Sequence, residues 1–271
     1  MLRSRCTRRR RIKVATYAFA VDLNRCVGCR ACVAACKIEN NTPEGVFWMH
    51  VFRFEEGIYP NVNESFLPRP CMHCDNAPCV SVCPTGARYK REDGFVLTDY
   101  DTCIGCRYCE VSCPYGVNFF NWRDPRQSYY YDWDGEGEDV YGSGSTREAI
   151  GDVVPPYHNP DLDKPHGPER KLNAGGGHRV GIIEKCTWCV HRVEKGLDPA
   201  CVANCPVFAL LFGDLDDPES KVSKILSRGR HSRLLLELGT EPRVYYVGAL
   251  PTGAAKPIPI VQKVMTDGGD R

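Results

Sequence analysis

The residues from Cys103 to Pro114, which read C-I-G-C-R-Y-C-E-V-S-C-P, constrain this chain more than any other stretch. Their cysteines follow the spacing C-x2-C-x2-C-x3-C, and a proline comes directly after the fourth. This is the spacing of iron–sulfur ligands, in which the first three thiolates hold one cluster from a single loop. We expect the fourth cysteine, Cys113, at the start of a helix, where it ligates a second cluster. The motif is therefore incomplete alone and predicts a partner motif elsewhere in the chain.

Three further cysteine motifs supply such partners. We number the motifs in chain order, which makes Cys103, Cys106, Cys109 and Cys113 motif III. The others are motif I (Cys26, Cys29, Cys32, Cys36), motif II (Cys71, Cys74, Cys79, Cys83) and motif IV (Cys186, Cys189, Cys201, Cys205). Together they use sixteen of the 17 cysteines, which gives four ligands to each of four 4Fe–4S clusters. Cys6 is left over and is interpreted as a free thiol on a mobile arm.

Loop length predicts how the motifs combine. Residues 21–30 parallel residues 98–107, and residues 78–84 parallel 199–206, so the chain is interpreted as two copies of a two-motif unit. Only residues 84–102 separate motifs II and III, the length of one hairpin, so these motifs should share two clusters; motifs I and IV then pair by elimination. The expected ligand sets are site A (Cys26, Cys29, Cys32, Cys205), site B (Cys36, Cys186, Cys189, Cys201), site C (Cys71, Cys74, Cys79, Cys113) and site D (Cys83, Cys103, Cys106, Cys109). The alternative, I with II and III with IV, stays open.

The predicted fold class is α+β, with two ferredoxin-like dicluster units related by internal duplication and a long loop insertion. The Asp93-Gly94 step predicts a β-hairpin over residues 87–97. Strands are expected at 14–23 and 243–248, a helix at 220–227, and a short helix after each fourth cysteine. Gly28 and Gly105, between ligating cysteines, should let the backbone approach a cluster closely.

The expected domain division follows from these motifs. Residues 14–66 plus 178–250 form the unit of motifs I and IV, and residues 67–125 form the unit of motifs II and III. Residues 126–177 hold no cysteine and many aromatic, acidic, glycine and proline residues, which indicates either a mobile surface loop or a docking insertion. Residues 251–271 are interpreted as an extended tail, disordered or laid across a partner.

Several function classes are excluded or disfavoured. The net charge of +1 gives no electrostatic bias toward nucleic acid, and no apolar run is long enough to cross a bilayer. The basic N-terminus is interpreted as a solvated arm rather than an export signal. Zinc would fit motif IV alone, but the third cysteine of motifs I and III has no place in a zinc pair. No C-x-x-C-H haem motif occurs, and His73 and His191 are interpreted as satisfied loop histidines. No catalytic set is identified, so the chain is expected to be non-catalytic.

Four motifs in this order resemble the four-cluster electron-transfer subunits of the molybdopterin oxidoreductases. That family includes the iron–sulfur subunits of dimethyl sulfoxide, polysulfide, tetrathionate and respiratory arsenate reductases. The stretches that carry the resemblance are residues 26–29, 35–42, 71–79, 103–116, 184–189 and 213–220.

The resemblance implies a role as well as a cofactor set. It implies the same pairing, motif I with IV and II with III, and four 4Fe–4S clusters. It implies a molybdopterin-type catalytic subunit and an integral membrane quinone-binding subunit as partners, with a multihaem cytochrome as a further candidate. The chain would lie peripherally on a membrane, with the periplasmic face, reached by co-export, favoured over the cytoplasmic one. The alternatives are a free-standing soluble polyferredoxin and, from another class, a zinc-bound scaffold.

Overall fold

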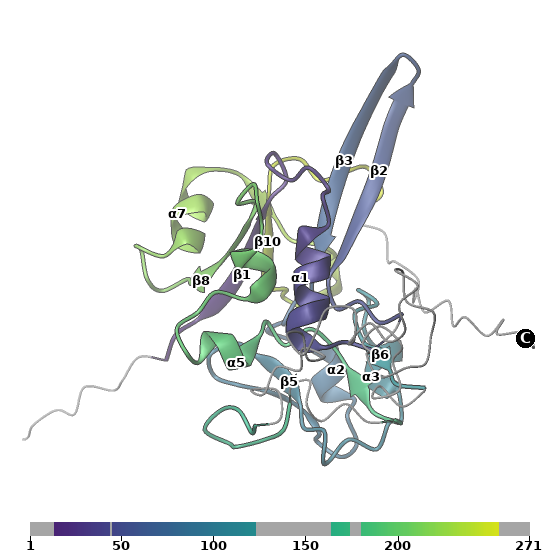
Figure 1. Cartoon of the computed structure of the whole chain (residues 1–271), viewed down its shortest axis with the longest axis vertical. Helices are drawn as coiled ribbons and strands as arrows, with labels where there is room; N and C mark the ends of the chain where they lie inside the picture. The colour runs from purple at the N-terminus through teal and green to yellow at the C-terminus, as the bar shows by residue number, and fades with distance from the viewer. Residues whose placement is uncertain (1–13, 44, 123–163, 174–179, 255–271) are drawn as a thin grey trace, which may run out of the picture.

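The computed structural model describes residues 14–43, 45–122, 164–173 and 180–254 (Figure 1). The described elements mix short strands with short helices, as an α+β fold requires. In chain order they are β1 (Tyr17–Asp22), α1 (Ala31–Asn40), β2 (His50–Ile58), β3 (Asn61–Arg69), α2 (Pro78–Ser81), β4 (Arg88–Lys90), β5 (Val96–Thr98), α3 (Tyr108–Val111), β6 (Phe119–Phe120), β7 (Ile183–Glu184), α5 (Val190–Val193), α6 (Ala200–Ala203), β8 (Leu210–Asp214), α7 (Lys221–Arg228), β9 (His231–Ser232), the 3₁₀ helix η6 (Leu236–Leu238) and β10 (Val244–Val247).

The largest sheet joins the beginning of the chain to its last third. Its strand order is β8-β1-β10-β9, with β1 parallel to β10 and antiparallel to β8. Helix α7 covers one face through Val222, which packs against Ala18 and Ala20 of β1. The strands expected at 14–23 and 243–248 and the helix expected at 220–227 are confirmed, with slightly different ends. Because β1 leads into motif I and β8 follows motif IV, this sheet holds those two motifs together.

A long two-stranded hairpin between motifs I and II was not foreseen from the sequence. Strands β2 and β3 pair from His50 and Arg69 at the base to Ile58 and Asn61 at the tip. The hairpin projects away from the rest of the molecule (Figure 1). At its base the hydroxyl of Tyr246, in β10, donates to the carbonyl of Pro68 over 3.0 Å. The hairpin's base is therefore anchored on the body, while Ile58 at its tip is exposed.

The expectation of a short helix after each fourth cysteine is wrong. Helices α2, α3 and α6 carry the third cysteine of motifs II, III and IV and end before the fourth. Proline follows each of those fourth cysteines, and a residue before proline is forced out of the helical region, so the helix cannot continue. Motif I has Lys37 in that place, and there the helix α1 continues through Cys36 to Asn40.

The hairpin expected at 87–97 is confirmed as β4 and β5, paired antiparallel. Next to it lies an aromatic core. The ring of His73 stacks on Trp188 with 4.0 Å between ring centres, and Phe95 and Phe212 meet Trp188 edge-on. Trp188 belongs to motif IV and His73 to motif II, so this core joins the two halves of the chain.

Two predicted segments fall largely outside the described residues. These are most of the 126–177 insertion and the 251–271 tail beyond residue 254; Cys6 is also outside. Residues 164–173 of the insertion are described and pack on the chain itself. The amide of Tyr100 donates to the carbonyl of Leu172 over 2.9 Å, the side-chain amide of Asn173 donates to the Tyr89 hydroxyl over 3.0 Å, and Lys171 pairs with Asp99.

Candidate metal centres

Two loops with matching backbones carry motifs I and III. Gly28 and Gly105 adopt left-handed conformations, with φ of +67° and +66°, which glycine alone takes without strain. A Cβ on Gly28 would lie 2.6 Å from Cγ of Phe66, and one on Gly105 would overlap the carbonyl of Gly181. The sequence predicted that both glycines let the backbone approach a cluster closely. The structure adds a reason that the sequence did not give, namely the close approach of a neighbouring chain segment.

Three cavities each have four cysteines in their walls. Their volumes are similar, about 300, 340 and 310 Å³ including space open to solvent, so each can take a group of the same size. The cysteines are those of site A (Cys26, Cys29, Cys32, Cys205), site C (Cys71, Cys74, Cys79, Cys113) and site D (Cys83, Cys103, Cys106, Cys109). The structure thus brings together the residues grouped by loop length, and their role as the ligands of one cluster each stays a prediction.

The cysteines of site B are all buried and face one another. After burial, the charges of Cys186 and Cys189 raise the pKa of Cys36, and those of Cys189 and Cys36 raise the pKa of Cys201. The side-chain amide of Asn40 donates to the sulfurs of both Cys36 and Cys189, at 3.6 Å each. Asn40 therefore links α1 to motif IV across the site.

Backbone and side-chain N–H groups point at cysteine sulfurs in several sites. The amide of Ala209 donates to Sγ of Cys205 over 3.3 Å, and the amide of Trp188 donates to Sγ of Cys186 over 3.4 Å. In site D the amide of Arg88 donates to Sγ of Cys83 over 3.4 Å. Such hydrogen bonds stabilise thiolates and are one of the factors that set cluster potentials.

Burial and crowding make several of the buried thiols hard to ionise on their own. Burial, with the charges of neighbouring cysteines second, raises the pKa of Cys32 and of Cys186 to about 12. The pKa of Cys83 shifts the other way: burial would raise it, but hydrogen bonds from the amide of Arg88 and from Thr85 outweigh burial and lower it. Four thiolates sharing one buried space need compensating positive charge, which a metal cluster supplies on binding. The donor set therefore fits iron–sulfur clusters. Within the described residues, no three His, Cys, Asp or Glu side chains lie close enough to hold a single metal ion.

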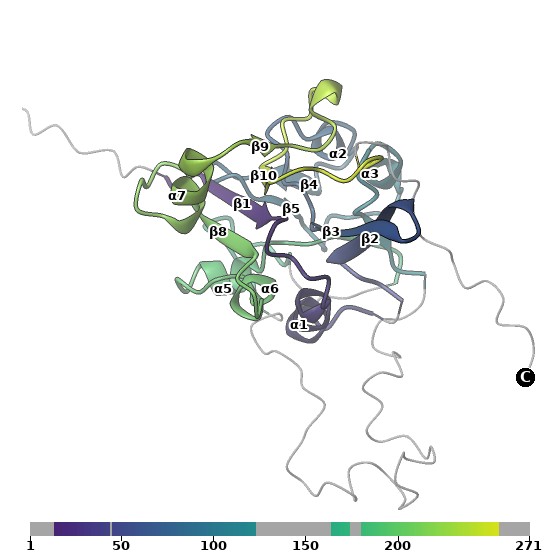
Figure 2. The same cartoon turned by 90° about the horizontal axis from the view of Figure 1, so that it is seen from above.

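The four sites follow one another in the order A, B, C, D. Sites A and B adjoin through α1, which carries Cys32 of site A and, one turn later, Cys36 of site B. Sites B and C adjoin at Trp188, whose amide donates to Sγ of Cys186 and whose Nε1 donates to the carbonyl of Cys71 over 3.2 Å. Sites C and D share the side chain of Arg88, which interacts with cysteines of both. Helix α1 lies beside α6, and α2 lies beside α3 in a separate group (Figure 2).

Exposure separates the ends of this series from its middle. All four cysteines of site B are buried, and so are three of those in site C. Cys29 of site A and Cys106 of site D are exposed. The two end sites are therefore the ones that reach the surface.

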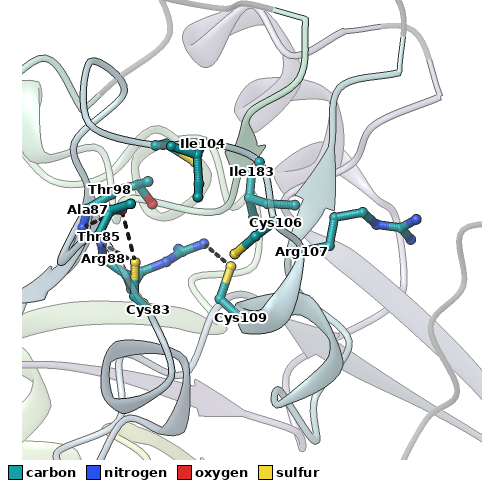
Figure 3. A pocket seen from close by; sticks show the side chains of 12 residues that line it. Cys83, Thr85, Ala87, Arg88, Thr98, Ile104, Cys106, Arg107, Cys109 and Ile183 are labelled. Atoms are coloured by element: carbon teal, nitrogen blue, oxygen red, sulfur yellow. Dashed lines mark hydrogen bonds between the residues drawn. The ribbon is translucent and has the colours of Figure 1, made fainter.

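Sequence reasoning missed two polar residues that reach the sulfurs. Asn40 lies just beyond motif I, and Arg88 begins strand β4, where its Nη2 donates to Sγ of Cys109 over 3.3 Å (Figure 3). Arg88 opens the polar run R-Y-K-R-E-D, which suggests a solvated hairpin face. Its burial, at 2% exposed, comes only from the three-dimensional arrangement. Asn40 carried a signal in its fixed spacing of four residues from Cys36, which puts both on one helix face.

Family comparisons agree with this chemistry. Two family descriptions, both given as a 4Fe-4S dicluster domain, match the chain, one over residues 62–128 and 176–215 and the other over residues 25–87. Together they include all four motifs.

Individual relatives are similar over most of the chain. It is 41% identical to the arsenate respiratory reductase iron-sulfur subunit of Shewanella sp. strain ANA-3, covering 84% of this chain and 94% of the relative. It is 42% identical to a selenate reductase subunit of Mesobacillus selenatarsenatis, covering 85% and 71%. It is 33% identical to the menaquinone reductase iron-sulfur cluster-binding subunit of Nitratidesulfovibrio vulgaris, covering 85% and 88%.

The fold and the cysteine sites define a 4Fe–4S protein with several clusters. The chain belongs to the family of iron–sulfur subunits of oxidoreductase complexes, which confirms the resemblance found in the motifs. The predicted 4Fe–4S cofactors are likewise confirmed, and the sixteen motif cysteines are consistent with four of them. Among the helices described, none is long and apolar enough to span a membrane.

Proposed function

We propose that this chain is the electron-transfer subunit of a membrane-associated respiratory oxidoreductase complex and performs no substrate chemistry itself. The observation that carries the proposal is the serial arrangement of four cysteine groups, with exposed cysteines only in the two end groups. A series of redox sites that reaches the surface at both ends suits a chain that passes electrons between two other proteins. The clusters, when bound, supply one-electron transfer at each site.

The chain's own residues hold and insulate that series. Sites A to D would be held by the cysteine sets given above, with motif I paired to IV and motif II to III. Buried Trp188 and His73 fill the space beside sites B and C and exclude water there. Excluding water keeps the effective dielectric low, so hydrogen bonds and charges near each site act strongly on its potential.

Each end site is framed by exposed apolar side chains. Beside site A, Val27 and Phe208 are 57% and 65% exposed. Beside site D, Ile104 and Trp122 are 65% and 51% exposed, with Tyr108 close by in sequence. Apolar residues that surround an exposed redox site support docking of a partner at each end.

The partners proposed are a molybdopterin-type catalytic subunit at one end and an integral membrane quinone-binding subunit at the other. The relatives named as arsenate, selenate and menaquinone reductase subunits support both kinds of partner. A multihaem cytochrome is a further candidate. We place the chain peripherally on the membrane and favour the periplasmic face.

The domain division is proposed on the same basis. Residues 14–66 with 178–250 would form the unit of sites A and B, and residues 67–125 that of sites C and D, the two being copies of one ancestral unit. The equivalent glycine conformations at Gly28 and Gly105 support the duplication. Residues 126–177 would serve as a docking insertion on the second unit, to which residues 164–173 are already bonded.

Purification from native membranes under anaerobic conditions tests the proposal. The expected result is about sixteen irons per chain, with molybdenum or tungsten in stoichiometric amount in the same complex. If the chain elutes alone with its complete iron content and without molybdenum or tungsten, the result would support the soluble polyferredoxin instead. Zinc in place of iron would contradict both the complex subunit and the soluble polyferredoxin.

A further inference from the structure

A single guanidinium group lies between sites C and D. Arg88 is 2% exposed, and its Nη2 donates to Sγ of Cys109 in site D over 3.3 Å. Figure 3 shows the side chain extending across the cavity of site D toward Cys109, in contrast to Arg107, which points out of the cavity. After burial, which opposes the charge, Cys109 and Cys79 are the groups that most strongly raise the pKa of Arg88. The cation thus faces thiolates of both sites.

The rest of the protein does little to neutralise this charge. Nε and Nη1 of Arg88 are buried and have no hydrogen-bond partner among the described residues, and no carboxylate pairs with the group there. The other buried cation near site C, Lys185, differs in this respect, because its Nζ donates to the carbonyls of Val96 and Cys186. An unpaired buried cation is costly. It is tolerated here because the groups around it are negative.

The other half of the chain offers a built-in comparison. Both halves contain a Cys-Pro step followed by an alanine four residues after the cysteine, and then the first residue of a strand. In one half that residue is Arg88 of β4; in the other it is Leu210 of β8, which is buried and lines the cavity of site A. The same position therefore holds a cation beside sites C and D and an apolar side chain beside site A.

We propose that Arg88 is a fixed buried cation that tunes the clusters in sites C and D. Its charge raises their reduction potentials above the values they would have with an apolar residue in its place. A thiolate-bound cluster becomes more negative by one charge when it accepts an electron, and a nearby cation stabilises that reduced form in a low-dielectric interior. No bond forms or breaks, and one site is oxidised as the next is reduced. The inference rests on the proposed function, because it requires clusters in sites C and D.

The consequence is an asymmetric chain of sites. Electrons would reside preferentially on the clusters of sites C and D, next to the cation. The reduction potential in the A–B half would be lower, because Leu210 occupies the equivalent position beside site A. Arg88 would also favour transfer between C and D, because one charge stabilises the electron on either side of it. The difference in reduction potential between the halves would come from Arg88 in one half and Leu210 at the equivalent position in the other.

The test is a redox titration of the purified complex, monitored by the electron paramagnetic resonance of the reduced clusters. Arg88→Leu, which copies the residue of the other half, should lower two of the four midpoint potentials. We expect the reduction equilibrium of at least one of them to change about tenfold, which is about 59 mV for a one-electron couple. Arg88→Lys, which keeps the charge, should restore most of the shift. Arg228→Leu removes an arginine from the exposed end of α7 and should leave all four potentials unchanged.

Iron content separates the possible outcomes. Arg88→Leu with about sixteen irons per chain and four unshifted potentials would overturn the inference while leaving the proposed function intact. An equal fall in Arg88→Leu and Arg88→Lys would also overturn it, since the role would then be shape and not charge. Wild-type protein without iron–sulfur signals would remove the proposed function itself. Where Arg88→Leu fails to retain clusters, Arg88→Lys and Arg88→Met decide, because a charge effect separates those two variants and a packing effect does not.

Discussion

Replacing Gly105 by alanine should destabilise the protein far more than the same change at another glycine with the same backbone conformation. Gly105 has φ of +66°, and an added Cβ would overlap the Gly181 carbonyl oxygen, lying 2.9 Å from its carbon and 3.0 Å from a ring carbon of Phe120. Gly86 has φ of +68°, and its added Cβ would meet nothing within 4 Å. The two glycines therefore share the conformational cost and differ only in space.

The magnitude follows from two terms. A left-handed conformation costs an L-residue roughly 1–2 kcal/mol. Inserting a methyl group against a backbone carbonyl, which cannot rotate away, adds about 1–3 kcal/mol of overpacking. Gly105→Ala should therefore lose about 2–5 kcal/mol and Gly86→Ala about 1–2 kcal/mol. Since Gly105 lies between Cys103 and Cys106, the damage should appear first at site D.

The assay is thermal bleaching of the holoprotein followed by its iron–sulfur absorbance, at one scan rate because such unfolding is commonly irreversible. Each kcal/mol corresponds to a shift of about 2–4 °C in midpoint for a chain of this size. Gly181→Ala, with φ of +81° and no atom within 4 Å of its Cβ, is a second control. If Gly105→Ala bleached at the same midpoint temperature as the two controls, the close approach to Gly181 would contribute nothing to stability. The reasoning would then be refuted.

Three further predictions concern other parts of the fold. His191 donates a hydrogen bond to Glu39 over 2.9 Å, and this bond is the main factor lowering the Glu39 pKa. The ionised carboxylate therefore stabilises the folded state. This contribution is complete above the ordinary pKa of 4.5 and is lost as the pH falls through the lowered pKa. Wild type should therefore bleach more slowly than Glu39→Gln at pH 6–7, with the difference closing below about pH 4.5; a constant difference would contradict this. Ser220→Ala removes the cap of α7 and should cost about 1 kcal/mol without changing any cluster potential; a shifted potential would contradict the separation of α7 from the sites. Trp188→Ala removes a buried ring whose Nε1 donates to the Cys71 carbonyl, and should cost about 3–5 kcal/mol with loss of iron from sites B and C, whereas unchanged iron would show that the ring only fills space.

Much of the site was predictable because ligand spacing is a local property. Three cysteines within seven residues define one side of a site whatever the rest of the chain does, and the length of residues 84–102 limits which motif can reach which. The hairpin at 87–97 was equally local, since Asp93-Gly94 is a strong turn signal. Strand β10 and helix α7 followed from a short β-branched and aromatic run and from Ser220 at a helix start.

What the sequence did not reveal depends on tertiary contacts. The β2–β3 hairpin turns at Tyr59 and Pro60 and lacks the Asn-Gly or Asp-Gly step that marks a short hairpin. The helices were expected after the fourth cysteines, although the prolines there already exclude a helix across the cysteine and point to its end. Arg88 has no sequence signal of burial, because its neighbours Lys90 and Arg91 are charged. Only the packing of β4 against the cysteine loops makes it a buried group.

The central claim is that two pairs of motifs interlock, so that motif III and Cys83 of motif II serve the same site. Iron content of a double variant tests it most directly. Cys106→Ala and Cys83→Ala should each impair one site, and the double variant should impair no more than that same site, a loss of about four irons relative to wild type. If Cys83 and Cys106 serve different sites, as the pairing of motif I with II requires, the double variant would lose about eight irons and contradict the account.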